Sequence, residues 1–541
     1  MKPQKSVFPK WGWFLLPAIA LAWKGLWLWR QAFPFNADEA IVALMARHIL
    51  HGERPIFFYG QAYMGSLDAF LVAAAFKVFG QKVLAIRLVQ AMLYAIIVDL
   101  SAYLALRLSK KPLAAWAVGL LLAVPTVNMT LYTTVSLGGY GEAMLIGTAL
   151  LILALRPCSA TPWGAAAWGA LFGLGLWAFG FVAVYALPAA LFIFLKWSQG
   201  CKFGFRKRAR LALFGAFGAV VGAFPWWWYG LEHGWRPLLD ELLGSAVAVE
   251  HVGWIARTAR HLLSFLALGL PVTLGVRPPW GVEVLAPPLA ALAVGIYAIW
   301  ALEAWRHRSF PSSGAWLMWG VAATLVAGFL FTSFGVDPSG RYFLPLTQVL
   351  FVGLGCFLGG VMRRARWLGI GALGVVLLFH GLSTAQAASN PYRLTTQFAP
   401  DARVRPGYEK ALMEFLRSHH LLRGYTNYWV AYPLAFLSEE QIIFIPRLPY
   451  HQDMRYTPRD DRYPPYDRLV ECAKHVAYIT TGQPALEKQL REAFRTHNIS
   501  WKEKLIGDYR IFYALSAPIT PWEMEISPPP SLKCERTEAP K

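Results

Sequence analysis

The sequence predicts a polytopic α-helical membrane protein of about 11 spans, followed by a C-terminal extracytoplasmic α/β domain. Hydrophobic residues make up 56% of the 541 residues and charged residues only 15%, too little charge for a soluble chain of this length. Lys and Arg gather in short loops between apolar runs, and the 24 Trp residues suit membrane interfaces. The apolar pattern ends near residue 389.

The formal net charge of +20 does not indicate nucleic-acid binding, because the basic residues follow the positive-inside pattern of membrane loops. Segment 66–80 is too short to cross the bilayer. If segment 262–276 also stays on one side, the basic loops share one face, and Asp38, Glu142, Arg341 and the C-terminal region share the other. The expected spans then cover 11–29, 84–106, 112–128, a stretch ending at Arg156, 163–179, 181–195, 211–229, 284–303, 315–334, 343–361 and 367–386.

Two domains follow from this pattern: a membrane domain, 1–388, in the inner (plasma) membrane, and an extracytoplasmic domain, 389–541. The second domain alternates expected helices and strands, which indicates an α/β fold. Cys472 and Cys534 could pair there, or remain two lone thiols. The expected elements are a helix at 405–422, strands at 441–445 and 476–479, a helix at 484–496 and a strand at 509–513.

An acid pair, Asp38 and Glu39, stands directly after the first span. Asn36 precedes it as a candidate N-cap, and Glu39 three residues later resembles a capping box. Apolar residues then continue at helical spacing with Arg47 and Glu53 on a wetter side, which predicts a short amphipathic helix on the bilayer surface. Capping alone is a sufficient reason for acids in a first turn, since they interact favourably with the helix dipole.

Charged residues on the predicted outer face suit a lipid-linked phosphate substrate. An Arg can bind a phosphate bidentately, and a carboxylate can take the proton of an acceptor hydroxyl. The alternatives are that Arg341 is a snorkelling interfacial cation and that Glu142 caps a span. The residues on this face are Asp38, Glu39, Asp68, Glu142, Asp337 and Arg341.

A divalent metal is left open, and no metal ligand is predicted. His48 and His51 are three residues apart and could share a metal with the nearby acids, but interfacial polar residues are the more common reason for such a pair. The first loop contains no Asp-x-Asp pair, which weakens a metal requirement.

Three short elements carry a resemblance to a known family. They are Asp38-Glu39 after the first span, the segment from Phe57 to Asp68 with its Tyr-Gly-Gln and Met-Gly-Ser runs, and the Arg-Tyr-x-x-Pro element from Arg341 to Pro345. Together they resemble the bacterial GT-C membrane glycosyltransferases, which include relatives of the protein O-mannosyltransferases and of lipid A aminoarabinose transferase. The similarity in layout covers roughly residues 10–386.

The resemblance implies an inverting glycosyltransferase that uses a polyprenyl-phosphate monosaccharide on the outer face. Asp38 is implied as the general base and Glu39 as its partner, and Arg341 as the residue that binds the donor phosphate and stabilises the leaving group. Glu142 is implied as a second acid. Asp68 is implied as a substrate-binding residue and stands where the family has Glu, so its side chain is one methylene shorter. The other implied substrate-binding residues are Tyr342, Tyr59, Gln61 and Tyr63.

The expected partners are the lipid-linked sugar donor, membrane lipids and an acceptor that the sequence does not specify (glycolipid, polysaccharide or protein). The aromatic run from Tyr425 to Pro433 could cover the site, hold the acceptor or fill the domain's core. A transporter or flippase of a lipid-linked sugar is the alternative function. It predicts charges near mid-membrane and inverted repeats, whereas the acids lie in outer loops. The sugar and the oligomeric state are not indicated.

Overall fold

The computed structural model describes residues 8–156, 161–201, 203–242, 252–306, 314–337 and 339–530. The chain forms two compact units. The first unit comprises Met1–Phe33 and Ala62–Ser389, and the second comprises Pro34–Gln61 and Asn390–Lys541. The segment that follows the first helix therefore packs with the C-terminal region.

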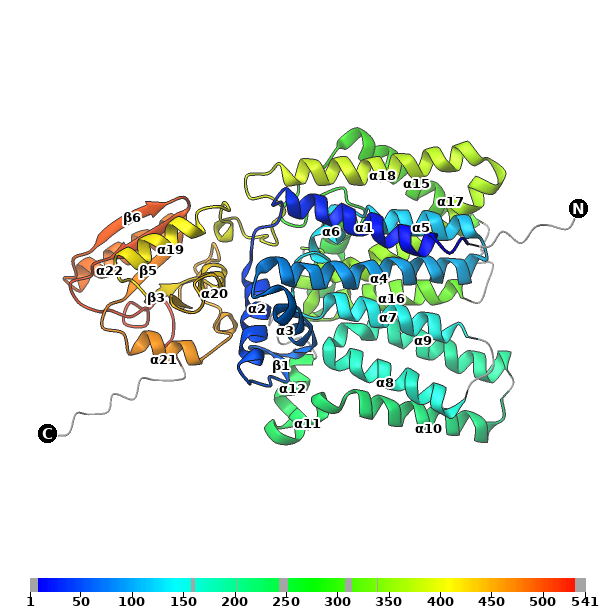
Figure 1. Ribbon diagram of the computed structural model, residues 1–541, viewed down its shortest axis with the longest axis horizontal. Helices are drawn as coiled ribbons and strands as arrows, with labels where there is room; N and C mark the ends of the chain where they lie inside the picture. The colour runs from blue at the N-terminus through cyan, green and yellow to red at the C-terminus, as the bar shows by residue number, and fades with distance from the viewer. Residues whose placement is uncertain are drawn as a thin grey trace, which may run out of the picture. The chain divides into compact units, whose positions relative to one another are not determined.

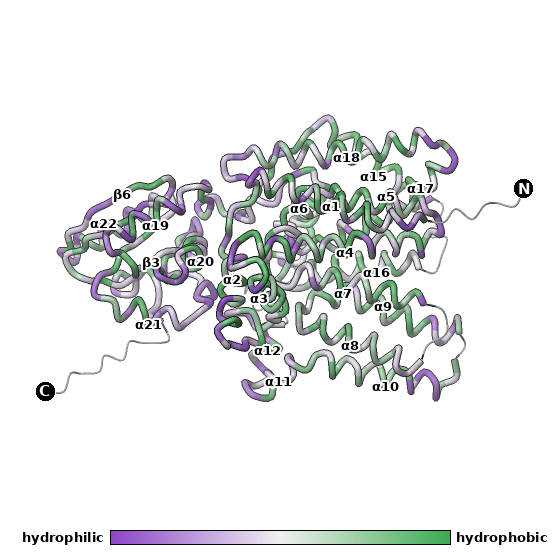
Figure 2. Tube along the Cα trace, viewed as in Figure 1, coloured by the Kyte–Doolittle hydropathy of each residue, from purple (hydrophilic) through white to green (hydrophobic). Residues whose placement is uncertain are grey.

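The first unit is helical, and α4 lies against α1, α5 and α7 (Figure 1). Figure 2 shows that its long helices are mostly hydrophobic along their length. Its longer helices are α1 (Gly12–Trp29), α3 (Leu67–Phe79), α4 (Val83–Ser109), α5 (Pro112–Ala123), α7 (Tyr140–Ala154), α8 (Pro162–Ala178), α9 (Ala183–Leu195), α10 (Phe205–Gly222), α11 (Phe224–His233), α13 (Trp254–Ser264), α15 (Pro287–Arg306), α16 (Ala315–Phe331), α17 (Leu344–Arg364) and α18 (Arg366–Ala388). The short helices are α6 (Val127–Tyr132), α12 (Trp235–Leu242) and α14 (Leu270–Thr273).

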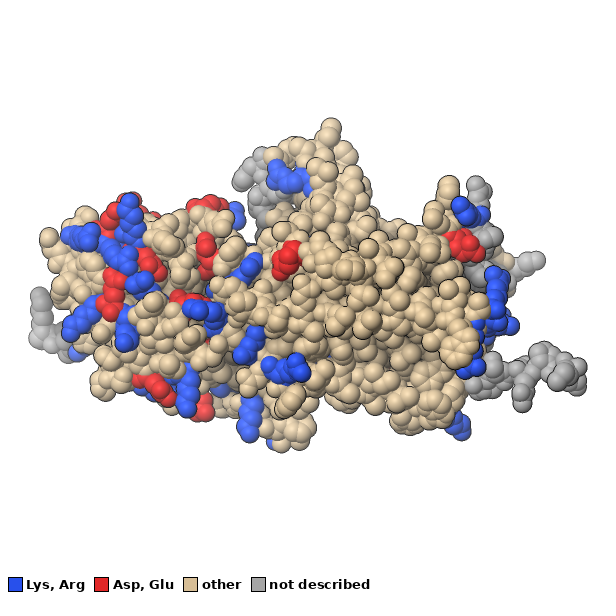
Figure 3. Space-filling model, turned by 90° about the horizontal axis from the view of Figure 1, so that it is seen from above, with Lys and Arg blue, Asp and Glu red and all other residues tan. Residues whose placement is uncertain are grey.

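Six helices among the described residues are long and apolar enough to cross a membrane, or seven if the bent pair α10 and α11 forms one span. Helices also occupy the other expected positions, but α5, α7 and α16 have only 12, 15 and 17 residues. A straight crossing needs about 20 residues. The multi-pass membrane character is therefore supported, whereas the count of 11 spans is not established. On the face in Figure 3, charged side chains are sparse along this unit, and Lys and Arg gather at one end.

Neither ambiguous segment is among the helices long and apolar enough to cross a membrane. Segment 66–80 is mostly α3, which has 13 residues. Segment 262–276 begins inside a continuous helical run over 254–273, which consists of α13, a π-helical turn at Phe265–Gly269 and α14.

The C-terminal region contains a five-stranded sheet of order β4-β3-β5-β7-β6. β3 runs parallel to β4 and β5, while β7 is antiparallel to β5 and β6. Because parallel strands need crossover connections, α20 joins β3 to its neighbour β4, and α21 joins β4 to β5 on the other side of β3. The elements are α19 (Glu409–Ser418), β3 (Arg423–Thr426), α20 (Tyr428–Leu437), β4 (Ile443–Pro446), α21 (Pro465–Glu471), β5 (Ala477–Thr481), α22 (Pro484–Thr496), β6 (Lys502–Ile506) and β7 (Tyr509–Tyr513).

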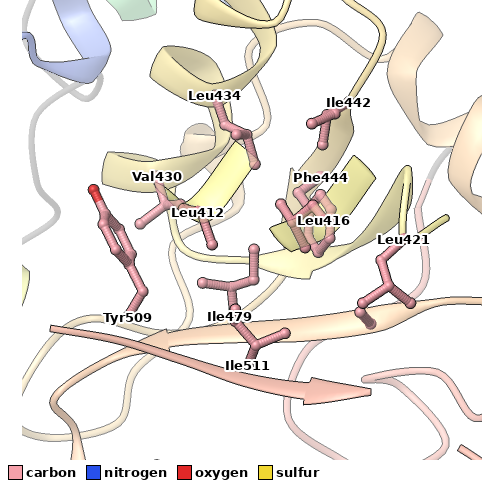
Figure 4. Packing of buried hydrophobic residues seen from close by; sticks show 11 residues of the cluster. Leu412, Leu416, Leu421, Val430, Leu434, Ile442, Phe444, Ile479, Tyr509 and Ile511 are labelled. Carbon is pink, nitrogen blue, oxygen red and sulfur yellow. The ribbon is translucent and has the colours of Figure 1, made fainter. Parts of the chain in front are cut away.

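Helices α19 and α20 pack their apolar sides against this sheet (Figure 4). Leu412 and Leu416 lie one turn apart on α19, as Val430 and Leu434 do on α20, so each helix presents one stripe. The strands contribute Phe444, Ala477, Ile479, Tyr509 and Ile511. Cys534 lies outside the described residues, so its pairing with Cys472 stays a prediction.

The acid pair opens α2 (Ala37–Leu50), which packs against α20, and β1 (Phe57–Phe58) and β2 (Gln61–Gly65) follow. The predicted N-cap is confirmed, because Asn36 Oδ1 accepts a hydrogen bond from Glu39 N at 3.0 Å. Of the two residues expected on the wet side, Glu53 is exposed, but the expectation for Arg47 is wrong. Arg47 is buried, lies 4.6 Å from the Phe436 ring centroid and donates to the Phe436 carbonyl at 3.2 Å. Contact with α20 thus replaces exposure to water.

Candidate functional site

Asp38 is the second residue of α2, and its carboxylate is held from the C-terminal region. Tyr428 Oη donates a hydrogen bond to Asp38 Oδ1 at 2.5 Å. Asp38 is half-buried, and its Oδ2 accepts no hydrogen bond from the described residues. One carboxylate oxygen is therefore fixed, while the other is available to a ligand.

Arg462 and Asp460 complete a polar group around Asp38 and Tyr428, here called the Asp38 cluster. The Arg462 guanidinium lies 5.6 Å from the Tyr428 ring centroid, and its Nη1 donates to the Gly60 carbonyl at 3.3 Å. Burial raises the pKa of the Asp460 carboxyl to about 7, with Arg462 opposing the rise and the negative charge of Asp38 adding to it. The cluster therefore contains, besides the Asp38 carboxylate, the Asp460 carboxyl, whose pKa is near neutral.

Glu39, the other member of the acid pair, is fully buried. Its backbone N–H is capped by Asn36 at the start of α2. Of the two acids, Asp38 is the less buried.

The far end of α2 is anchored by His48. Its Nδ1 lies 2.9 Å from Tyr59 Oη, and its Nε2 lies 3.0 Å from Glu440 Oε1. Burial opposes ionisation of Glu440, but hydrogen bonds from His48 and Tyr466 outweigh it and lower the pKa of that carboxyl to about 2. Tyr59, predicted to bind substrate, here also donates to Glu53 Oε2 at 2.6 Å.

His48 thus has protein partners, whereas His51 is exposed. Within the described ranges, no group of three or more His, Cys, Asp or Glu side chains is placed to hold a metal ion.

A cleft opens in the same unit beside the start of α2, lined by Phe35 and Asn36 before the helix and by Trp429 and Val430 of α20. Its cavity volume is about 50 Å³. Leu412 and other apolar side chains complete most of its wall. Trp429 Nε1 is buried and has no acceptor among the described residues. The lining also includes the polar residues Thr395, Gln397 and Glu409, so the wall is mixed polar and apolar, as small-molecule sites often are.

In the helical unit, Arg341 begins a 3₁₀ turn, Arg341–Phe343, that leads into α17. Its Nε lies 2.6 Å from Asp337 Oδ2, and its side chain keeps 31% of its surface exposed. The preceding Gly340 has φ +92°, and a Cβ there would lie 2.7 Å from Val272 and 2.9 Å from Asn128. Only glycine fits this turn without displacement of its neighbours.

Aromatic rings join three of the predicted residues. The Arg341 guanidinium lies 5.1 Å from the Tyr342 ring centroid, and the Tyr342 ring lies 5.1 Å from Phe334. Phe334 in turn lies 6.5 Å from Tyr63, which belongs to β2. The structure therefore gathers Tyr63, Arg341 and Tyr342. Gln61, half-buried, begins the same strand.

Asp68 and Glu142 form a second, buried group in the helical unit. Asp68 Oδ1 accepts from Gln90 Nε2 at 2.9 Å, and Oδ2 accepts from Ser136 Oγ. Glu142, in the first turn of α7, interacts with Asp68, and neither of its carboxyl oxygens has a hydrogen-bond donor among the described residues. The two predicted residues are thus together and enclosed.

Sequence reasoning did not identify Asp460 or Arg462, and it named Tyr428 only as part of the aromatic run that could cover the site, hold the acceptor or fill the core. It also missed Lys24, which is buried in α1 and donates to Thr133 O at 2.6 Å. A lysine inside the first span is the signal that could have identified it, because buried charges in membranes are costly. Asp38 and Arg341 belong to different units, and their meeting in one cavity stays a prediction.

No family model and no curated protein matches the chain. Among solved structures, it is similar to ArnT from Cupriavidus metallidurans bound to undecaprenyl phosphate, with 14% identity, a TM-score of 0.56, and coverage of 95% of this chain and 100% of ArnT. For ArnT in the apo state the identity is 13%, the TM-score 0.59, and the coverage 93% and 97%. This likeness shows the fold, and the predicted resemblance to GT-C glycosyltransferases is confirmed at that level.

Proposed function

We propose that the protein is an inverting glycosyltransferase that moves a monosaccharide from a polyprenyl-phosphate donor to an acceptor hydroxyl on the extracytoplasmic face of the inner membrane. Asp38 carries the proposal: it has one oxygen fixed by Tyr428 and the other available. The fold supports it, since a protein with this fold has been solved with undecaprenyl phosphate bound. We assign 1–388 to the membrane domain and 389–541 to the extracytoplasmic domain.

In the proposed reaction, Asp38 Oδ2 takes the proton of the acceptor hydroxyl. The acceptor oxygen forms a bond to the anomeric carbon as the bond from that carbon to the phosphate oxygen breaks. Polyprenyl phosphate leaves with the electron pair, and attack from the opposite face inverts the anomeric configuration. The proton on Asp38 then passes to water.

Arg341 is proposed to bind the donor phosphate and to stabilise the charge that develops on it. The ion pair with Asp337 engages Nε, and the partly exposed side chain leaves the outer guanidinium nitrogens able to bind phosphate. Tyr342 and Tyr63 lie around this cation, so we assign them to the donor site with Gln61 of β2.

We assign structural roles to the enclosed acids Glu39, Asp68 and Glu142. Glu39 belongs to the capped start of α2, and the Asp68–Glu142 pair links the starts of α3 and α7. Tyr59 holds the end of α2 through His48. We place the acceptor in the cleft beside Asn36, because its lining reaches within two residues of Asp38.

The test uses purified full-length protein in nanodiscs with a panel of undecaprenyl-phosphate hexoses and an aminopentose, and a solubilised envelope extract as the acceptor source. The transferase must release undecaprenyl phosphate, measured by mass spectrometry, and Asp38→Asn must abolish the release. Asp453→Asn, at an exposed carboxylate in the C-terminal region, is the matched control.

The same assay distinguishes the proposed transferase from the alternative function. A transporter or flippase moves the lipid-linked sugar without breaking the sugar–phosphate bond, so movement of a fluorescent donor across vesicles without release would favour it. Release that persists in Asp38→Asn counts against the proposed base.

A further inference from the structure

The hydrogen bond from Tyr428 to Asp38 assigns a role to a residue of the C-terminal region. Tyr428 lies 390 residues further along the chain, at the start of α20, outside every membrane motif. We propose that Tyr428 is a positioning residue for Asp38, which holds Oδ1 so that Oδ2 faces the acceptor hydroxyl. The inference rests on the proposed function.

The phenol of Tyr428 is suited to hold a carboxylate in one orientation. Its ring is buried and packs edge-to-face on Trp429 and Tyr432, at centroid distances of 4.8 Å and 5.5 Å. The Asn427 side chain fixes the start of α20 by accepting from Trp429 N at 3.0 Å. The Tyr428 hydroxyl therefore has little freedom to turn away from Asp38.

The direction of the hydrogen bond is also fixed. Burial, together with the negative charge of Asp38, holds the pKa of the Tyr428 phenol well above its ordinary value, and Arg462 only partly opposes this. The phenol stays protonated through the physiological range, so the tyrosine is the donor and the carboxylate the acceptor.

The start of a helix offers a first-turn carboxylate competing partners. Unpaired backbone N–H groups and the positive end of the dipole attract a first-turn carboxylate toward its own helix. In α2, Asn36 Oδ1 already occupies the Glu39 N–H. Asp38 instead accepts from the Tyr428 hydroxyl, and its side chain accepts no hydrogen bond from the described N–H groups of this turn.

Three elements place charged or titratable groups around Asp38. They are Tyr428 of α20, Asp460 and Arg462 in the segment before α21, and Glu39 on α2 itself. A carboxylate that loses a hydrogen-bond donor is protonated more readily, so loss of the Tyr428 hydroxyl moves the acid limb of the rate profile to higher pH.

The test is Tyr428→Phe in the full-length protein, with whichever undecaprenyl-phosphate sugar of the panel shows turnover. We expect kcat to fall about tenfold or more, the donor KM to stay unchanged, and the acid limb of kcat to move to higher pH. Tyr478→Phe is the matched control. It removes another buried hydroxyl of the same region, which donates to the Ile519 carbonyl, and should leave both kcat and the pH profile unchanged.

A second variant covers the case in which Tyr428→Phe does not fold. Site-specific replacement of Tyr428 by 3-fluorotyrosine keeps the hydroxyl and strengthens it as a donor, so the acid limb should move to lower pH. An unmoved limb in both variants, with Asp38→Asn inactive, overturns the positioning role and leaves the proposed function standing. Turnover that persists in Asp38→Asn overturns the proposed function instead.

Discussion

His48 Nε2 lies 3.0 Å from Glu440 Oε1, which joins α2 to a segment that follows it by 392 residues. Tyr466 donates to the same carboxylate oxygen at 2.6 Å, and Arg47 Nη1 lies 3.4 Å from Oε2. The Glu440 carboxylate thus links the end of α2 to the C-terminal region.

Glu440→Gln should destabilise the protein at neutral pH. The folded pKa of Glu440 is about 2, below the ordinary value, so its stabilisation is present above about pH 4.5 and is lost as pH falls toward 2. The shift corresponds to at most about 3 kcal/mol, less because the side chain is partly exposed. Thermal unfolding in detergent between pH 3 and 7 should show a lower and flatter stability curve for the variant. Glu439→Gln, at the exposed neighbour, should follow the wild type.

Asp460→Asn should have the opposite effect. The folded pKa of Asp460 is about 7, raised mainly by burial, whereas an unfolded Asp titrates near 3.9. Ionising the buried carboxyl destabilises the fold progressively from about pH 4 to 7, by a few kcal/mol at most. The variant should therefore be more stable than the wild type at pH 8 and equal to it near pH 4. An equal difference at both pH values would contradict the assignment.

Gly340→Ala tests the turn that presents Arg341. The positive φ and the contacts of an added Cβ with Val272 and Asn128 predict a loss of about 1–3 kcal/mol and a displaced guanidinium. Gly371→Ala is the control, because nothing lies within 4 Å of a Cβ there. In the interior of α18 that change should stabilise the helix slightly. Unfolding temperature and binding of undecaprenyl phosphate, followed by native mass spectrometry, separate stability from site geometry.

The buried acid pair predicts unequal effects of its two members. Asp68→Ala leaves Gln90 and Ser136 without an acceptor, which costs about 1–3 kcal/mol. Glu142→Gln supplies an amide that can donate to Asp68, so it should preserve or raise the unfolding temperature. Equal destabilisation by both variants would show that the two side chains are not held as described.

Local chemistry made several parts of the fold predictable. The Asn36 cap lies three residues from Glu39, the amphipathic run at 484–496 is α22, and the β-branched and aromatic run at 509–513 is β7. The burial of Arg47 was not predictable, because the contact with Phe436 comes from a helix far along the chain. The partners of Asp38 were missed for the same reason: no local pattern indicates that Tyr428 reaches an acid 390 residues earlier.

Arg341→Lys tests whether the guanidinium geometry or only the charge is needed. Lysine keeps the positive charge near Asp337 but presents one nitrogen, so it cannot bind a phosphate bidentately while it retains the ion pair. We expect the donor KM to rise about tenfold and kcat to fall, since stabilisation of the departing phosphate weakens as well. Arg341→Ala should lose donor binding and turnover almost completely. Arg417→Lys, on the surface helix α19, is the matched control. Wild-type kinetics in Arg341→Lys would mean that a point charge suffices there, and wild-type kinetics in Arg341→Ala would remove this residue from the donor site.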